Sequence, residues 1–215
     1  MRTFFALELG AAARLAAAEL VGVLRARPGG EGVRWVRPET LHVTLRFLGQ
    51  TPAAALGALA HHVAGQISAL PPFMLGLGGV QAFPSPRRPR VIALHVVPEA
   101  PVRALAAAVE AGVVAAGFPA ERRPFRAHVT LGRVTRPSAS GLMPREALAR
   151  ESGQEVREIV LFESRSGPDG SVYTPLERIA LGCGAAADAA PAHEVHPHSG
   201  DPEETPHGDD WHHSR

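Results

Sequence analysis

The tetrapeptide His-Val-Thr-Leu occurs twice in this chain of 215 residues, at positions 42–45 and 128–131, which are 86 positions apart. Both copies lie in short apolar, β-branched stretches bounded by Pro and Gly, a pattern typical of strands. Alternate side chains of a strand point to opposite faces, so each His shares a face with the Thr two residues later. The Val and Leu residues on the other face belong in a core. Two such strands lying near each other would bring two imidazoles and two hydroxyls into one cleft.

The segments around the two tetrapeptides repeat the same order of expected elements. In the first half we expect a strand at 4–9, a helix to about 27, a strand at 41–48, a helix at 53–69 and a strand at 73–83. In the second half we expect a strand at 91–96, a helix at 101–116, a strand at 127–134, a short helix near 144–151 and strands at 156–163 and 173–181. Thr51 and Pro52 suit the start of the helix at 53–69 as its cap and first-turn residues. The matched order indicates an internal duplication.

The charge of the chain is divided unevenly along its length. The chain contains no Lys and all 22 basic residues are Arg, so the abundance of Arg does not by itself indicate a nucleic-acid-binding protein. Residues 1–182 hold 21 Arg against 14 acidic residues, a net charge of +7, whereas residues 183–215 hold one Arg against 7, a net charge of −6. A basic body suits an anionic substrate.

The last segment, 183–215, lacks hydrophobic periodicity and is rich in Ala, Pro, Asp, Glu and His. We expect one bilobal domain at 1–182 followed by a disordered acidic tail at 183–215. Six of the 11 His residues lie in the tail and could bind transition metals weakly, but a flexible spacer is the favoured interpretation.

The single cysteine, Cys183, excludes an intramolecular disulfide and fits a reducing compartment. The N-terminus does not resemble a signal peptide, and no apolar run reaches the roughly 18 residues that a membrane span requires. We therefore expect a soluble, cytoplasmic protein without a membrane partner, and a monomer.

Two imidazoles and two hydroxyls in one cleft suit the opening of a cyclic phosphodiester by water. One group must take a proton from the water and another must give one to the leaving oxygen, and imidazole suits both tasks because its pKa is about 6.5. The Thr44 and Thr130 hydroxyls and a guanidinium can stabilise the charge on the non-bridging oxygens. No metal ion or cofactor is required by this scheme.

Segments outside the tetrapeptides also match a family pattern, at 4–9, 34–49, 82–91, 123–131 and 164–176. With them the chain resembles the RNA 2′,3′-cyclic phosphodiesterase branch of the two-histidine phosphoesterase superfamily, also called the 2′-5′ RNA ligase family. The resemblance spans about residues 2–182, and the two His-x-Thr-x motifs are highly specific in combination.

The resemblance implies an α+β fold, with two pseudo-symmetric α/β lobes whose largely antiparallel sheets face a central cleft. It implies that His42 and His128 are catalytic and that Thr44, Thr130 and Arg133, which lies five residues after His128, bind the substrate phosphate. It further implies hydrolysis of 2′,3′-cyclic phosphate ends of RNA or nucleotides to the 2′-phosphate, with His42 as acid and His128 as base, and reverse 2′-5′ ligation of RNA.

Two other functions are compatible with the same cleft. One is a non-catalytic RNA- or nucleotide-binding module, although pure binding would not need two proton carriers. The other is hydrolysis of a different cyclic phosphate, such as a cyclised ADP-ribose derivative. Turnover on a panel of cyclic phosphates would separate these functions.

Several other side chains are weaker candidates. His61 and His62 point about 100° apart on a helix and favour a surface position over a metal site, and His95 favours a partly buried position. The arginines of the turn at 84–90 are as easily solvated as bound to RNA phosphates. Phe47 and Phe125 could stack a base, but core packing is the favoured interpretation.

Overall fold

The computed structural model describes residues 1–136, 153–167 and 170–182, all within the unit Met1–Gly184. These residues form three α-helices, α1 (Ala11–Ala26), α2 (Leu56–Ile67) and α3 (Glu99–Ala115), and short 3₁₀ turns at Gly30–Gly32, Pro38–Thr40 and Ala53–Ala55. Their strands are β1 (Arg2–Glu8), β2 (Val33–Trp35), β3 (His42–Gln50), β4 (Phe73–Phe83), β5 (Val91–Val97), β6 (His128–Val134), β7 (Gln154–Val156), β8 (Glu158–Gly167) and β9 (Gly170–Ala180).

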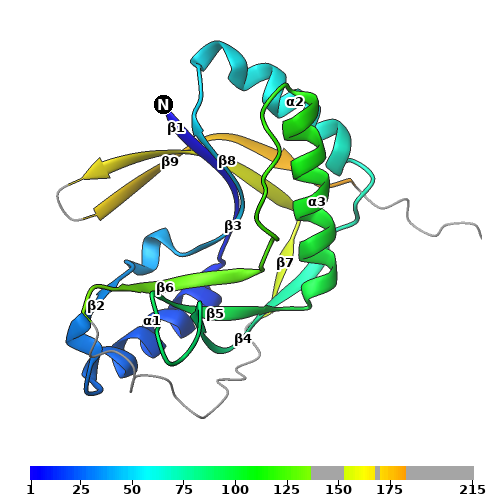
Figure 1. Cartoon of the computed structure of the whole chain (residues 1–215). Coiled ribbons are helices and arrows are strands. Elements are labelled where there is room, and N and C mark those ends of the chain that lie inside the picture. The colour runs from blue at the N-terminus through cyan, green and yellow to red at the C-terminus, as the bar shows by residue number, and fades with distance from the viewer. Residues whose placement is uncertain (137–152, 168–169, 183–215) are drawn as a thin grey trace, which may run out of the picture. The chain divides into compact units, whose positions relative to one another are not determined.

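The described strands form one antiparallel sheet in the order β7-β4-β5-β6-β3-β1-β8-β9, with β2 also paired to β6. The two motif strands, β3 and β6, lie next to each other at its centre and pair at Val43 and Val129. The halves on either side of this junction are the expected lobes: β1, β8 and β9 lie apart from β4, β5 and β6 in Figure 1. The expected α+β fold with antiparallel strands is confirmed.

The same pairing register occurs on both sides of the junction. Ala6 of β1 pairs with Thr44, and Ala93 of β5 pairs with Thr130. Strand β4 follows β1 and β3 along the chain but pairs with β5, and β8 follows β5 and β6 but pairs with β1. Each of these two strands thus crosses to the other half of the sheet. Each half of the sheet is therefore built from both halves of the chain.

The main core lies on one face of the sheet, beneath the three helices. The Val and Leu residues of both motifs are buried there, as expected from strand alternation: Val43, Leu45, Val129 and Leu131. Helices α2 and α3 lie side by side (Figure 1), and a Cβ atom added at Gly112 of α3 would lie 2.6 Å from the Cα atom of Val63 of α2. Burial of this apolar face fixes the side of the sheet on which the polar motif side chains must lie.

A smaller apolar cluster covers part of the opposite face. It consists of Phe4, Ala6, Val160 and Phe162, with the partly buried Tyr173 packed against them. These side chains come from β1, β8 and β9, so the cluster belongs to only one half of the sheet. It lies beside the first motif strand, and we call it the apolar cluster.

The predicted cap of the second helix is wrong. The Thr51 hydroxyl is buried and lies 2.7 Å from the Thr3 hydroxyl, and α2 begins only at Leu56, after a 3₁₀ turn that follows Pro52. A hydroxyl that already has a buried partner has less reason to bind the helix N–H groups. The short strand β7 was not expected, and the helix predicted near 144–151 lies outside the described residues. None of the described helices is long and apolar enough to cross a membrane.

Candidate active site

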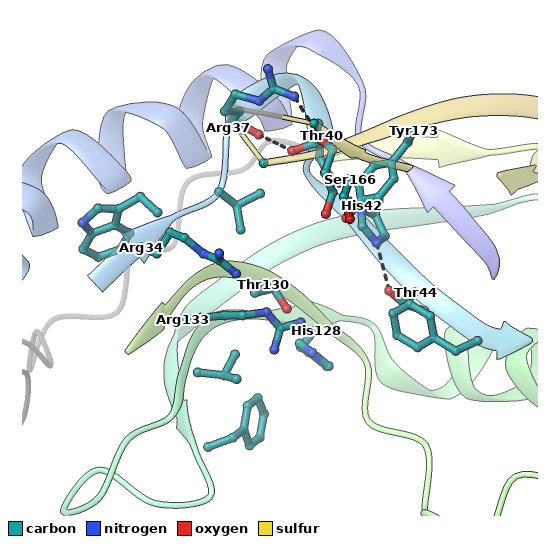
Figure 2. A pocket seen from close by; sticks show the side chains of 18 of the residues that line it. Arg34, Arg37, Thr40, His42, Thr44, His128, Thr130, Arg133, Ser166 and Tyr173 are labelled. Carbon is teal, nitrogen blue, oxygen red and sulfur yellow. Dashed lines mark hydrogen bonds between the residues drawn. The ribbon is translucent and has the colours of Figure 1, made fainter. Parts of the chain in front are cut away.

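A cleft of about 580 Å³ lies on the motif side of the sheet. All five residues expected to form the site line it: His42, Thr44, His128, Thr130 and Arg133. Strands β3 and β6 supply these side chains, and Figure 2 shows them converging from the two strands. The structure thus brings together the residues that the sequence singled out.

A one-residue irregularity in β6 explains how Arg133 reaches the cleft. Strict alternation would place Arg133, five residues after His128, on the core face. The register of β6 shifts, however, because Thr130 pairs with Ala93 while Gly132 pairs with the preceding residue, Ile92. The unpaired residue between them is Leu131, and a bulge of this kind changes which face the following side chains occupy. Arg133 therefore follows Thr130 into the cleft.

The same shift occurs in β3, with a different side chain at the matching position. Thr44 pairs with Ala6 while Arg46 pairs with Phe5, which leaves Leu45 unpaired. Arg46 consequently forms an ion pair with Glu110 of α3, and Phe47 lines the cleft. Phe47 is 52 % exposed, so the expectation that it packs in the core is wrong.

His42 is held in one tautomer by its surroundings. Its Nδ1 lies 2.7 Å from the Thr40 carbonyl oxygen, which can only accept, so Nδ1 carries the hydrogen. Its Nε2 lies 2.9 Å from the Thr44 hydroxyl, which donates to Nε2 when the ring is neutral. The ring packs beside Phe4 at 5.0 Å and against the edge of Tyr173 at 5.2 Å between ring centroids.

The apolar cluster also alters the pKa of His42. Burial, the largest effect, lowers the pKa of His42 below its ordinary value of 6.5, because an apolar environment disfavours the charged ring. The hydrogen bond to the Thr40 carbonyl opposes this shift, and the nearby His128 lowers the pKa further. The structure thus favours a neutral His42 before a substrate binds.

His128 has the same backbone contact in a different setting. Its Nδ1 donates to the Arg126 carbonyl oxygen at 2.8 Å, which leaves Nε2 for the cleft. Its ring meets Phe83 edge-on at 5.3 Å, and the Arg126 guanidinium lies over the same Phe83 ring at 5.6 Å. Within the described chain, the Thr130 hydroxyl has no hydrogen-bond partner, so it can bind a substrate oxygen without first releasing His128.

The cleft is strongly basic. Its described lining includes Arg34, Arg37, Arg126 and Arg133 but no Asp or Glu. Arg37 donates to the Ser171 carbonyl oxygen at 3.0 Å, which ties the turn before β3 to the start of β9. Such a surface attracts an anion and does not offer the carboxylate ligands that Mg²⁺ or Ca²⁺ prefers.

The weaker candidates lie elsewhere. The arginines at 87, 88 and 90 do not line the cleft, His61 and His62 are exposed on α2, and Phe125 packs against the core. His95 is partly buried, as expected. Among the described residues, no group of three or more His, Cys, Asp or Glu side chains is arranged to hold a metal ion.

Among the cleft residues that were not singled out from the sequence as site residues are Arg34, Arg37, Ser166 and Tyr173. They fell only within segments that match the family pattern. The spacing of the motifs contains no signal that β8 and β9 reach the cleft. That contact depends on the pairing of β8 with β1 and of β9 with β8.

Comparison with known proteins agrees with this geometry. The family model described as LigT like phosphoesterase matches residues 9–93 and 95–173. The chain is 32 % identical over 178 residues to the RNA 2′,3′-cyclic phosphodiesterase of Archaeoglobus fulgidus, covering 82 % of this chain and 98 % of the relative. It is 34 % identical over 190 residues to the protein of the same name from Thermus thermophilus, covering 84 % and 90 %.

Solved structures show the same fold. The crystal structure of TT0787 of Thermus thermophilus matches with a TM-score of 0.71 at 31 % identity, covering 85 % of this chain and 99 % of that one. E. coli LigT complexed with 3′-AMP matches with a TM-score of 0.70 at 30 % identity, covering 84 % and 97 %. The chain belongs to the LigT-like phosphoesterase family.

Proposed function

We propose that this protein hydrolyses the 2′,3′-cyclic phosphate ends of RNA to 2′-phosphates by acid–base catalysis with two histidines. The names of its relatives and its family membership support a cyclic phosphodiesterase. One observation carries the proposal: His42 and His128 each have Nδ1 held by a backbone carbonyl, while both rings line one basic cleft. This arrangement presents two proton carriers to a single anionic group.

Each imidazole has a distinct task in the reaction. The Nε2 of one ring takes a proton from water as the water oxygen attacks phosphorus, and the Nε2–H of the other gives a proton to the departing 3′-oxygen. One ring must therefore start neutral and the other protonated. Because burial lowers the pKa of His42, we propose His42 as the base and His128 as the acid. This is the reverse of the order implied by the family resemblance.

The remaining site residues stabilise charge on the phosphate. The Arg133 guanidinium and the Thr130 hydroxyl have no partner among the described residues, so both can donate to the non-bridging oxygens. Thr44 must turn from His42 Nε2 to the phosphate, which releases the Nε2 lone pair for the water. Binding of the phosphate thus prepares the base.

The test is turnover on a panel of 2′,3′-cyclic phosphates, including RNA oligonucleotides, mononucleotides and a cyclised ADP-ribose derivative, after exhaustive chelation. We expect hydrolysis of RNA ends to the 2′-phosphate and no loss on chelation. Turnover of the small molecules alone would replace RNA as the substrate. Binding of RNA without turnover of any substrate would identify a binding module, and a requirement for added Zn²⁺, Mn²⁺ or Mg²⁺ would contradict the scheme.

Two further assays complete the proposal. Incubation with RNA ends that carry a cyclic phosphate and a 5′-hydroxyl tests reverse 2′-5′ ligation. Sedimentation tests whether the protein is a monomer. A cytoplasmic location is part of the proposal, since a single cysteine suits a reducing compartment.

A further inference from the structure

Arg34 lies directly beside Arg133 in the lining of the cleft. The two residues are pairing partners across β2 and β6, and strands in such a pair are about 5 Å apart. Both side chains line the cleft, and Figure 2 shows them extending from neighbouring strands toward Thr130 and His128. Hydrogen bonds around Arg34 hold β2 in place: Trp35 Nε1 donates to the Gly30 carbonyl oxygen at 3.0 Å, and Val36 N donates to the Leu131 carbonyl oxygen at 2.8 Å.

This pair of guanidiniums lacks the acidic partners that some other arginines of the protein have. Arg46 has Glu110, Arg103 has Glu99 and Arg178 has both Glu8 and Glu158, whereas within the described residues neither Arg34 nor Arg133 has an acidic or hydrogen-bonding partner. Like charges directly opposite each other in a sheet are destabilising. Both residues are exposed, so the two neighbouring guanidiniums are open to an anionic ligand that would offset their repulsion.

The number of charges points to more than one phosphate. A terminal cyclic phosphate carries one negative charge, and in the proposed reaction it already meets Arg133 and a protonated His128. Arg34, the exposed residue of β2, adds a further guanidinium to the cleft lining beside Arg133. In an RNA end, the next anionic group is the phosphodiester that joins the terminal nucleotide to the rest of the chain.

We propose that Arg34 binds the phosphodiester adjacent to the terminal cyclic phosphate and so makes the enzyme selective for RNA ends over mononucleotides. This inference rests on the proposed function and specifies its substrate class. Arg34 contributes to binding of the chain, while Arg133 acts at the phosphate that reacts.

The experiment compares a nucleoside 2′,3′-cyclic phosphate with a dinucleotide that has the same cyclic end. A third substrate carries an uncharged methylphosphonate in place of the internal phosphodiester. For the wild-type enzyme we expect kcat/KM on the charged dinucleotide to exceed that on the mononucleotide by about tenfold or more, as a charge-assisted hydrogen bond provides. The methylphosphonate dinucleotide should fall to the level of the mononucleotide.

The Arg34→Gln variant should bring the ratio of dinucleotide to mononucleotide kcat/KM close to one, and Arg34→Lys should retain part of the preference. Loss of one phosphate contact should also make the logarithmic salt dependence of dinucleotide binding shallower by about 0.7. Arg103→Gln removes the same charge from an exposed position on α3 outside the cleft, so the wild-type ratio should persist. Melting temperatures establish that the variants are folded.

Three results would overturn the inference: a wild-type ratio near one, an unchanged ratio in Arg34→Gln, or equal losses on both substrates, which would place Arg34 at the reacting phosphate. A binding assay with a dinucleotide 3′-phosphate, which cannot be hydrolysed by this reaction, keeps the test separate from catalysis. If wild type turns over no cyclic phosphate, the proposed function fails, while the charged and methylphosphonate forms of this ligand still decide whether Arg34 reads the internal phosphate.

Discussion

The two sides of the cleft share one backbone plan but differ in the chemistry of their side chains. On each side a His and a Thr project from a motif strand, and an Ala of the neighbouring strand pairs with the Thr. The position that follows the bulge, five residues after the His, is Phe47 on one side and Arg133 on the other. At this position the first side thus presents an apolar ring and the second a charge.

This difference gives two identical residue types different properties. His42 lies against Phe4 and Tyr173, and burial lowers its pKa, whereas His128 lies beside Phe83 in the half of the cleft that contains Arg133. A repeated motif can therefore supply both an acid and a base without changing either catalytic residue. In the proposed mechanism the neighbouring side chains, and not the motifs themselves, distinguish the two roles.

The largest effect should come from replacing either histidine. His42→Ala and His128→Ala should each lose nearly all turnover and one limb of a bell-shaped pH–rate profile, because each removes a required proton transfer. A substrate with sulfur in place of the departing 3′-oxygen needs no acid, so it should restore turnover to His128→Ala but not to His42→Ala. Rescue of His42→Ala instead would support the order implied by the family resemblance, and near-normal turnover of either folded variant would refute the mechanism.

The matching positions Arg133 and Phe47 should give losses of different kinds. Arg133→Ala should lower kcat about a hundredfold, since one transition-state donor is worth on the order of 3 kcal/mol. Phe47→Ala should mainly raise KM, by about tenfold, because an exposed ring in the cleft can contact a base but cannot bind a phosphate. Steady-state kinetics on one RNA substrate distinguish the two; a fall in kcat alone for Phe47→Ala would remove the contrast between the two sides.

Replacing either threonine should lower kcat by similar amounts. The loss should be smaller than for Arg133→Ala, because the bond from Arg133 to the phosphate is charge-assisted. We expect Thr130→Val and Thr44→Val each to lower kcat about tenfold, as loss of a hydrogen bond from a neutral hydroxyl to the phosphate does. Only Thr44→Val should also shift the limb of the pH–rate profile that reports His42, since Thr44 contacts Nε2 of that ring. Equal shifts in both variants would show that the hydrogen bond to His42 has no influence on its protonation.

A smaller effect concerns folding stability between neutral and mildly acidic pH. The pKa of His42 is lower in the folded protein than its ordinary value of 6.5, so the unfolded chain takes up the proton first as the pH falls. The free energy of unfolding should therefore decrease as the pH falls through 6.5, until the folded protein is protonated as well. Urea titrations of His42→Gln should show a smaller decrease, whereas the exposed control His61→Gln should behave like wild type.

The smallest effect should come from the tail, whose expected disorder lies outside the described residues. A chain that ends at Gly182 should keep the melting temperature and the activity of the full chain. Differential scanning calorimetry and turnover on the RNA substrate provide the comparison. A rise in activity after removal of this acidic segment would mean that it competes with RNA for the basic side of the cleft.

The sequence predicted the parts of the site that depend on local pattern. Alternation placed His42 with Thr44 and His128 with Thr130, and it placed Val43 and Val129 in the core. Alternation failed just after the motif, where a bulge is needed to bring Phe47 into the cleft and send Arg46 to the helix face. A bulge is specified by pairing with the neighbouring strand, so the motif strand alone does not reveal it.

The crossing of β4 and β8 between the two halves of the sheet could not be predicted for a related reason. Strand β8 pairs with β1 over a separation in sequence of more than a hundred residues, and β9 brings Tyr173 to the ring of His42. Neither contact leaves a trace in the local pattern of Ser166 or Tyr173. Family resemblance included these segments without indicating where they lie.

The crossing of β4 and β8 also bears on how such a sheet could arise. A polypeptide with only β1, β3 and β4 would expose the edges of β1 and β3 and leave its own third strand unpaired. A second copy related by a two-fold axis would provide pairing partners for all three strands. That axis would pass between the two motif strands. In such a symmetric dimer both sides of the cleft are identical, and a mutation on one side appears on the other. Joining the copies through the short connection between β4 and β5 frees the two sides to differ, as Phe47 and Arg133 now do.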